Sequence, residues 1–207
     1  YDLNHFSNLN SNLLKKTDYF FNSWSDKNII IHEGGAVRVD HASLRNIFEK
    51  SFLFALRIVG KIIQTVGGNE YAPKRKKTSD LISFLFSEKF KKKSLGNVNI
   101  FLNQGYLFFI RENINLNFGL KIQQNKHYIF DGRFLVKSSL AGKLVRCNNG
   151  DLVKIDNKSP FYKYGYWINN TLPYLETLEG KTIKPHLKIN KLNPNINVAE
   201  NDCFSLY

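Results

Sequence analysis

The hydrophobic period of the chain changes once, near residue 90, and this change constrains the fold more than any other feature. Upstream of it, apolar residues recur every three or four positions, which predicts amphipathic helices at 3–24, about 43–66 and about 78–89. Downstream, alternating apolar and polar residues predict strands within 94–113, 127–137, 143–147 and 152–155. The sequence therefore predicts an α+β protein, with a mainly helical domain over 1–90 and a mainly antiparallel β domain over 91–207.

Glycines mark the ends and turns of these elements. Gly67-Gly68 follows the last apolar position of the second helix, where a glycine in the left-handed conformation ends a helix. A phosphate-binding loop would instead follow a strand and open a helix, so we interpret the pair as a helix cap. Gly34-Gly35 and Asn103-Gln104-Gly105 predict the turns of two hairpins, within 28–44 and 94–113.

The apolar stripe of the second helix is wide, so we expect this helix to be buried on more than one side. Leu56, Val59 and Ile63 are its predicted core positions. Asp40 or Ser43 is the predicted N-cap of this helix, and Thr78 or Ser79 that of the third helix, after Pro73 has ended the preceding turn.

The charge of the chain favours a polyanionic partner. The formal net charge is +13; residues 1–45 are neutral overall, whereas residues 46–112 carry 12 basic and 5 acidic side chains. Two lysine-rich runs bracket the third helix, with Tyr71 and Phe90 beside them. Their members are Lys74, Arg75, Lys76 and Lys77, and then Lys89, Lys91, Lys92 and Lys93. They predict a nucleic-acid backbone site; the alternative is a lysine excess that reflects an A+T-rich genome.

No catalytic or metal-binding constellation is evident. The five histidines are scattered, and Cys147 and Cys203 are far apart with no zinc-ligand spacing. Asp131 in "FDGRF" is either a general base or, as Asp-Gly usually is, part of a turn. The longest apolar run, 52–63, is too short to span a bilayer and includes two basic residues. We therefore expect a cytoplasmic binding module with no catalytic residue, no metal and no membrane contact.

Several segments, in order, resemble the C-terminal region of bacterial tRNA(Ile)-lysidine synthase. "VGGNEYAPKR" (66–75) matches the family's Gly-Gly pair followed by Tyr, Pro and a basic residue. "KKSLGNVNIFLNQGYLFFIREN" (92–113) matches its basic-Thr-Leu-Gly-Gly opening and its closing Arg-Glu, here Arg111-Glu112. "HEGGAVRVDHASL" (32–44) and "FDGRF" (130–134) fit flanking family elements. Ser94 replaces the Thr, and Asn97 replaces the second Gly.

The resemblance implies that the chain is part of a larger enzyme, an interpretation that the absence of methionine also favours. In that family an N-terminal ATP-pyrophosphatase domain, whose Ser-Gly-Gly-x-Asp-Ser loop is not found here, adenylates the first anticodon cytidine of an isoleucine tRNA with a CAU anticodon. Lysine then displaces AMP. ATP, magnesium and lysine would bind to that domain, and no cofactor to this chain.

The resemblance further implies that this chain holds the acceptor stem and adjoining backbone of the tRNA. The phosphate contacts predicted from the basic runs are Lys74, Arg75, Lys76, Lys77, Lys91, Lys92, Lys93 and Arg111. Two alternatives stay open from the residues alone. One is a generic RNA-binding module of another modification enzyme, and the other is a protein-interaction domain.

Overall fold

A computed structural model describes residues 23–147, 152–187 and 204–206 of the chain. Residues 23–28 are helical and precede β1. The elements of the first half are β1 (Ile29–Ile31), β2 (Val37–Asp40), α2 (His41–Lys50), α3 (Phe52–Gly67), α4 (Arg75–Leu85), β3 (Lys92–Leu95), β4 (Val98–Asn103) and β5 (Tyr106–Arg111). Those of the second half are β6 (Lys121–Ile122), β7 (His127–Phe130), β8 (Phe134–Ser138), β9 (Gly142–Val145), η1 (Tyr162–Tyr164), α5 (Gly165–Asn169), β10 (Tyr174–Thr177), β11 (Thr182–Ile183), β12 (His186–Leu187) and β13 (Phe204–Leu206).

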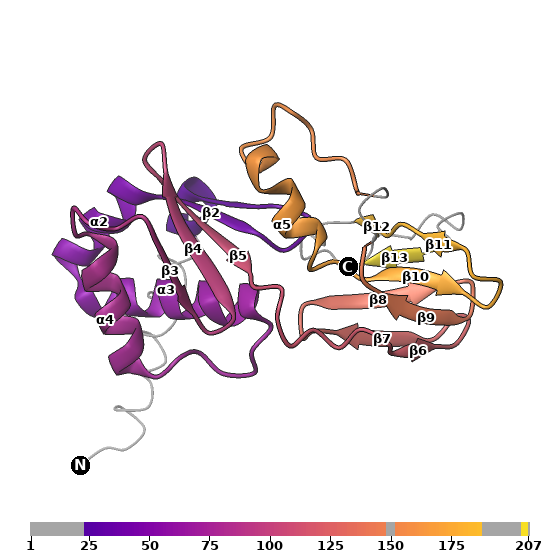
Figure 1. Cartoon of the computed structure of the whole chain (residues 1–207). Coiled ribbons are helices and arrows are strands. Elements are labelled where there is room, and N and C mark those ends of the chain that lie inside the picture. The colour runs from indigo at the N-terminus through magenta and orange to yellow at the C-terminus, as the bar shows by residue number, and fades with distance from the viewer. Residues whose placement is uncertain (1–22, 148–151, 188–203, 207) are drawn as a thin grey trace, which may run out of the picture.

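The first half forms a helix–sheet lobe. Its antiparallel sheet has the strand order β1-β2-β5-β4-β3, and α2, α3 and α4 cover one face (Figure 1). Apolar residues at alternate positions of β2, β4 and β5 face these helices and share one hydrophobic core with them. The sheet is completed by β3, an edge strand whose residues are exposed or half-buried.

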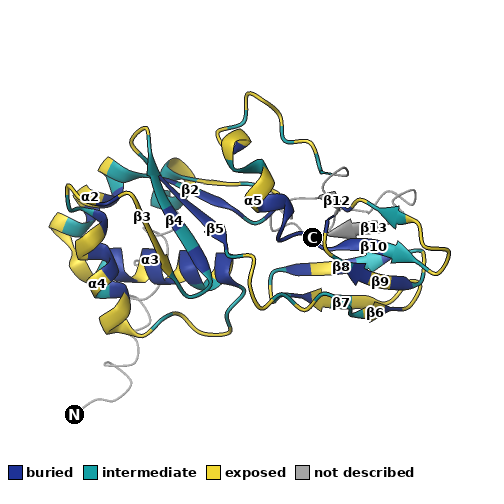
Figure 2. Cartoon of the chain, viewed as in Figure 1, coloured by how far each residue is buried: buried dark blue, intermediate teal, exposed yellow. Residues whose placement is uncertain are grey.

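α3 is the central helix of this lobe and is buried along most of its length (Figure 2). Leu56, Val59 and Ile63 all lie in the core, as the helical spacing predicted. The helix ends where Gly68 takes a left-handed conformation with φ of 63°, which confirms the predicted glycine cap. Asp40 caps α2, because its carboxylate accepts a hydrogen bond from the Ser43 backbone N–H at 2.7 Å.

The second half forms a β lobe of two four-stranded sheets, with orders β11-β10-β9-β6 and β12-β13-β8-β7. Their pairings are antiparallel except that of β12 with β13. A second hydrophobic core lies between them, built around Phe130, Val136, Leu144, Tyr174 and Leu175. The two lobes lie side by side, at the left and right of Figure 1, with α5 above the place where they meet.

The segment over 152–172 joins the two lobes. Phe161 and Ile168 pack on the sheet of the helix–sheet lobe, on the face opposite to the helices. Leu152 and Leu172, at the ends of the same segment, belong to the core of the β lobe. The chain therefore enters the β lobe after β5, returns to the first sheet, and enters the β lobe again.

The α+β class and the antiparallel sheets agree with the sequence prediction, but the order of elements is mixed rather than helical and then β. Strands β1 and β2 precede the helices, and β3–β5 complete the helices' core, so the predicted boundary near residue 90 falls inside the helix–sheet lobe. The predicted strand over 152–155 is not a strand. The predicted helix over 3–24 lies outside the described residues except at its end.

The predicted caps of the third helix are also corrected. α4 begins at Arg75, with Lys74 at the N-cap, and not at Thr78 or Ser79. Thr78 is buried, and its hydroxyl donates back to the Pro73 and Lys74 carbonyl oxygens at 3.4 Å. The Thr78 hydroxyl is therefore satisfied inside the helix by carbonyl oxygens of the preceding turn, and it does not act as an N-cap.

Candidate nucleic-acid interface

Four consecutive basic residues form the exposed start of α4. Lys74, Arg75, Lys76 and Lys77 are all exposed, and the first turn contains no acidic residue and no side-chain cap. Both properties are unfavourable for an isolated helix, because its N-terminus already carries partial positive charge and unpaired N–H groups. A bound anion would relieve both.

Further cations lie near this turn, in a groove between α3 and α4. It has a volume of about 450 Å³, an apolar floor that includes Leu56, and Arg57, Lys61 and Arg75 among its lining residues. None of the described residues that line this groove is a carboxylate. Arg57 and Lys61 were missed by the sequence analysis, although their spacing of four residues on the polar side of α3 predicts a common face.

A second groove lies on the other side of α4, between this helix and β3. Lys77 and Lys93 line it together with Asp80 and Phe84, and its volume is about 330 Å³. The Lys93 ammonium lies 5.8 Å from the centroid of the Phe84 ring. We call the five cations of the two grooves the cation band: Arg57, Lys61, Arg75, Lys77 and Lys93.

The run Lys91, Lys92 and Lys93 does not form one patch, although all three side chains are exposed. Side chains alternate along a strand, so Lys92 lies on the opposite face of the sheet from Lys93. Its ammonium is 4.8 Å from the Trp167 ring centroid and 5.1 Å from that of Phe101. Of the two aromatic residues near the basic runs, Tyr71 is exposed, whereas Phe90 is buried in the core.

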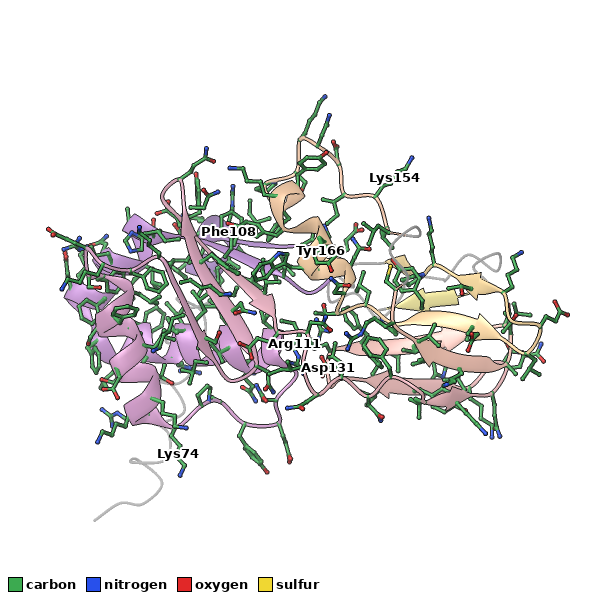
Figure 3. The ribbon with its side chains drawn as sticks, in the orientation of Figure 1. Lys74, Phe108, Arg111, Asp131, Lys154 and Tyr166 are labelled. Atoms are coloured by element: carbon green, nitrogen blue, oxygen red, sulfur yellow. The ribbon has the colours of Figure 1, made fainter. Side chains whose placement is uncertain are left out.

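Arg111 is not part of the basic surface, which corrects its predicted phosphate contact. Its side chain is 3% exposed, and its Nε and Nη2 atoms donate to the two carboxylate oxygens of Asp131 at 2.9 and 2.8 Å (Figure 3). Asp131 opens the β7–β8 turn with φ of 54°, so the turn interpretation of "DG" is correct. Its carboxylate is occupied by guanidinium groups and is not placed as a general base.

A second buried guanidinium shares this carboxylate. Arg133 Nε donates to Asp131 at 2.7 Å and its Nη2 donates to the Thr171 carbonyl oxygen at 2.8 Å. Burial lowers the pKa of Arg133 to about 10; Asp131 acts against this lowering, and the Arg111 charge adds to it to a smaller extent. Its Nη1 atom has no hydrogen-bond partner in the described part of the chain.

Four distant segments meet around this ion pair; we call the site the junction. Asn69 Nδ2 donates to the Gly96 carbonyl oxygen at 2.8 Å, and Arg111 Nη1 donates to that of Asn97 at 3.3 Å. Gly68 touches the β7–β8 turn so closely that a Cβ there would overlap the Asp131 carbonyl oxygen. Asn97 has a φ of 63°, a conformation that asparagine tolerates better than most residues.

Among residues 23–147, 152–187 and 204–206, no group of three or more His, Cys, Asp or Glu side chains is arranged to hold a metal ion. Of the helices in these ranges, none has both the length and the apolar character needed to cross a bilayer. No protein-family model, curated protein or solved structure matches the chain.

Proposed function

We propose that this chain is the tRNA-binding part of a tRNA(Ile)-lysidine synthase. The observation that carries the proposal is the cation band together with the exposed, uncapped start of α4. Lysine and arginine side chains in such a band neutralise phosphates and release counterions, which supplies affinity without reading sequence. Duplex RNA is recognised mostly in this way, through its backbone and shape.

The junction supports the family assignment. The segments that carry the resemblance, at 67–69, 96–97, 111–112 and 130–134, are far apart in the chain and lie together in the fold. The departure at Asn97 also fits, since the backbone there adopts a conformation open to glycine and asparagine alike. In this proposal the motifs hold the two lobes together, and the exposed cations of the helix–sheet lobe contact the tRNA.

The proposal divides the steps of the reaction between this chain and the other domain of the parent enzyme. The chain holds the acceptor stem and adjoining backbone, while lysine, ATP and magnesium bind to the ATP-pyrophosphatase domain of the parent enzyme. With an isoleucine tRNA, ATP and lysine, the purified chain alone is expected to release no pyrophosphate. Pyrophosphate release would contradict the assignment of all catalytic groups to the other domain.

The decisive experiment measures the binding of an isoleucine tRNA transcript at several salt concentrations. The variant K76Q/K77Q/K93Q removes Lys77 and Lys93 of the cation band and Lys76 of the α4 start, and K126Q/K143Q/K181Q removes three exposed lysines of the β lobe. We expect the first to weaken binding about tenfold or more and to reduce the salt slope by about 3, and the control to change both much less.

The result also separates the alternatives. Equal losses in both variants would show that only net charge matters and would overturn the placement of the site. No binding by the unsubstituted protein would favour a protein-interaction domain. A preference for isoleucine tRNA over other tRNAs would support the synthase over a generic RNA-binding module.

A further inference from the structure

The face of the first sheet opposite to the helices carries aromatic and basic side chains in one row. Cross-strand pairing places Arg38 beside Phe108, Phe108 beside Phe101, and Phe101 beside Lys92, across β2, β5, β4 and β3. The aromatic pair therefore lies in the middle of the row, with a cation on each side. Phe108 is buried in the core that this face forms with the 152–172 segment, whereas Phe101 is half-buried at the edge of that core.

The helix α5 covers one part of this face and adds aromatic side chains to it. Tyr164 of the preceding η1 packs on Phe108 with ring centroids 4.6 Å apart, and Phe108 is buried. Trp167 meets Phe101 edge to face at 4.9 Å but stays 37% exposed, and its neighbour Tyr166 is 58% exposed. The covered part is thus hydrophobic core, and its margin is an exposed aromatic surface.

The cations of this margin lie over aromatic rings. The Lys92 ammonium lies over both Trp167 and Phe101, and the Arg38 guanidinium lies 4.2 Å from the Tyr106 ring centroid. Each of these aromatic rings therefore has a cation close by. When a base stacks on the ring, this cation is within reach of the phosphate of the same nucleotide. We call Arg38, Lys92, Phe101, Tyr106 and Trp167 the sheet-face patch.

We propose that the sheet-face patch binds unpaired nucleotides of an RNA by stacking, an inference that rests on the proposed function. Aromatic side chains flanked by basic residues bind single strands with little sequence preference, because every base has a π-face. The occupant is an RNA rather than a protein, because positive charge flanks the exposed aromatic side chains. Duplex RNA offers no unstacked base to such a surface.

The position of β3 connects this patch with the cation band. Lys93 faces the α4 groove and Lys92 faces the patch, from adjacent positions of the same edge strand. A duplex held on the cation band could therefore continue as a single strand around the sheet edge. This geometry suits an RNA in which unpaired nucleotides follow directly after a helix.

Trp167 is a natural reporter of stacking, since the chain has two tryptophans and Trp24 packs against the helix–sheet core. The experiment uses the W24F protein, in which the tryptophan fluorescence comes from Trp167 alone, and titrates it with an eight-nucleotide oligoadenylate. We expect saturable quenching by the single strand and much weaker quenching by a blunt RNA duplex. W167L, which replaces the indole ring with a smaller apolar side chain, should lower the affinity about tenfold, and because this variant lacks the reporter its binding is measured by the fluorescence anisotropy of a labelled oligoadenylate.

L178A is the matched control, because Leu178 is exposed and apolar but lies at the β10–β11 turn. It should bind the oligonucleotide like the unsubstituted protein. Unquenched Trp167 fluorescence, or unchanged affinity in a folded W167L protein, would overturn the patch. Loss of self-association in W167L, with unchanged RNA binding, would overturn it in favour of a protein interface.

The two proposals can fail separately. K76Q/K77Q/K93Q leaves Lys92 and the aromatic side chains in place, so reduced tRNA binding with normal Trp167 quenching supports both surfaces. Reduced tRNA binding without any quenching supports the cation band and overturns the patch. Quenching by the oligonucleotide with no binding of tRNA supports the patch and overturns the proposed function.

Discussion

Asp131 balances two buried guanidinium groups, and the stability of the junction depends on this single negative charge. Arg111 and Arg133 are each 3% exposed and both donate hydrogen bonds to its carboxylate. Since the pKa of Arg133 is about 10, its guanidinium group remains charged at neutral pH. Among the described residues, Asp131 is the carboxylate that these two guanidinium groups share, so the electrostatic balance of the site depends on it.

Asp131→Asn keeps the shape of the side chain and removes its charge. We expect a loss of about 3–5 kcal/mol in the free energy of unfolding, because buried cations are left without a counterion. The control is Glu49→Gln, which breaks the exposed ion pair with Arg45 and should cost about 0.3–0.5 kcal/mol. Urea unfolding followed by circular dichroism measures both. Similar losses in the two variants would contradict the role given to Asp131.

His32 makes the stability of the helix–sheet lobe depend on pH. Burial lowers its pKa from the ordinary value of 6.5, and its Nδ1 accepts a hydrogen bond from the Gly34 backbone N–H at 2.9 Å. The neutral ring is therefore the form that the fold prefers. Its stabilising contribution is present above pH 6.5 and is lost as the pH falls from there through the lowered folded-state pKa.

His32→Asn should keep an acceptor for the Gly34 N–H and remove the titration. We expect the free energy of unfolding of this variant to change less than that of the unsubstituted protein between about pH 5 and 7. The comparison variant is His127→Asn, on an exposed position of β7. It should retain the original pH dependence; an equal flattening in both variants would show that His32 is not the titrating group.

At the level of single residues, the sequence predicted which residues form basic runs or helix ends better than it predicted where each side chain lies in the fold. The basic runs were identified, and Gly68 was correctly assigned to a helix end. Arg111 was misplaced, because its partner Asp131 is 20 residues away on another lobe and no local pattern records that approach. Lys92 and Lys93 were grouped together because the start of β3 was not predicted, and only the strand assigns them to opposite faces.

The start of α4 is an element whose composition favours binding over stability. Lys74 occupies the N-cap without a side-chain hydrogen bond, and three more basic residues follow it at the positive end of the helix. Serine or aspartate at this position would satisfy an unpaired N–H group. The absence of such a cap is explained if the ligand itself supplies the anion.

Lys74→Ser should therefore stabilise the protein and weaken RNA binding at the same time. We expect a gain of about 0.5–2 kcal/mol in the free energy of unfolding, together with a smaller salt slope for tRNA. The matched control is Lys50→Ser, at the last turn of α2, where a cation is favourable. That change should destabilise slightly and leave RNA binding intact. A Lys74→Ser protein with no gain in stability would contradict the assignment of the helix start.

For whole elements, hydrophobic period predicted the long ones well and the short ones poorly. The β4–β5 hairpin was predicted because its apolar positions repeat over many residues. The helix predicted over about 43–66 was found but is two helices, since Ser51 takes an extended conformation and separates α2 from α3. The strand predicted at 152–155 and the late start of the third helix were errors. Short apolar runs do not distinguish strands from packed loops, and a threonine that bonds to the preceding turn looks like a cap in sequence.

On the scale of the whole molecule, each lobe is built from segments that are not consecutive in the sequence. The sheet of the first lobe takes strands from both sides of residue 90, and the segment over 152–172 crosses back to that sheet from the β lobe. Sequence patterns cannot show this arrangement, because it depends on contacts between distant segments. The local pattern of each segment contains no information about the segment that it contacts. The α+β class follows from local patterns, whereas the division into lobes requires the topology.

The mixed core of the helix–sheet lobe leads to a prediction about the chain cut at residue 90. Ile58, Val59 and Ile63 of α3 pack in one core with Ile100 and Phe109, which lie beyond the cut. A protein of residues 1–90 would therefore expose the apolar side of its helices to water, so we expect it to lack cooperative unfolding and to aggregate. Circular dichroism and sedimentation of residues 1–90, with the full chain as the control, measure both properties. A soluble, cooperatively unfolding 1–90 protein would show that the helices form a domain of their own, and that the sheet is attached to it rather than part of its core.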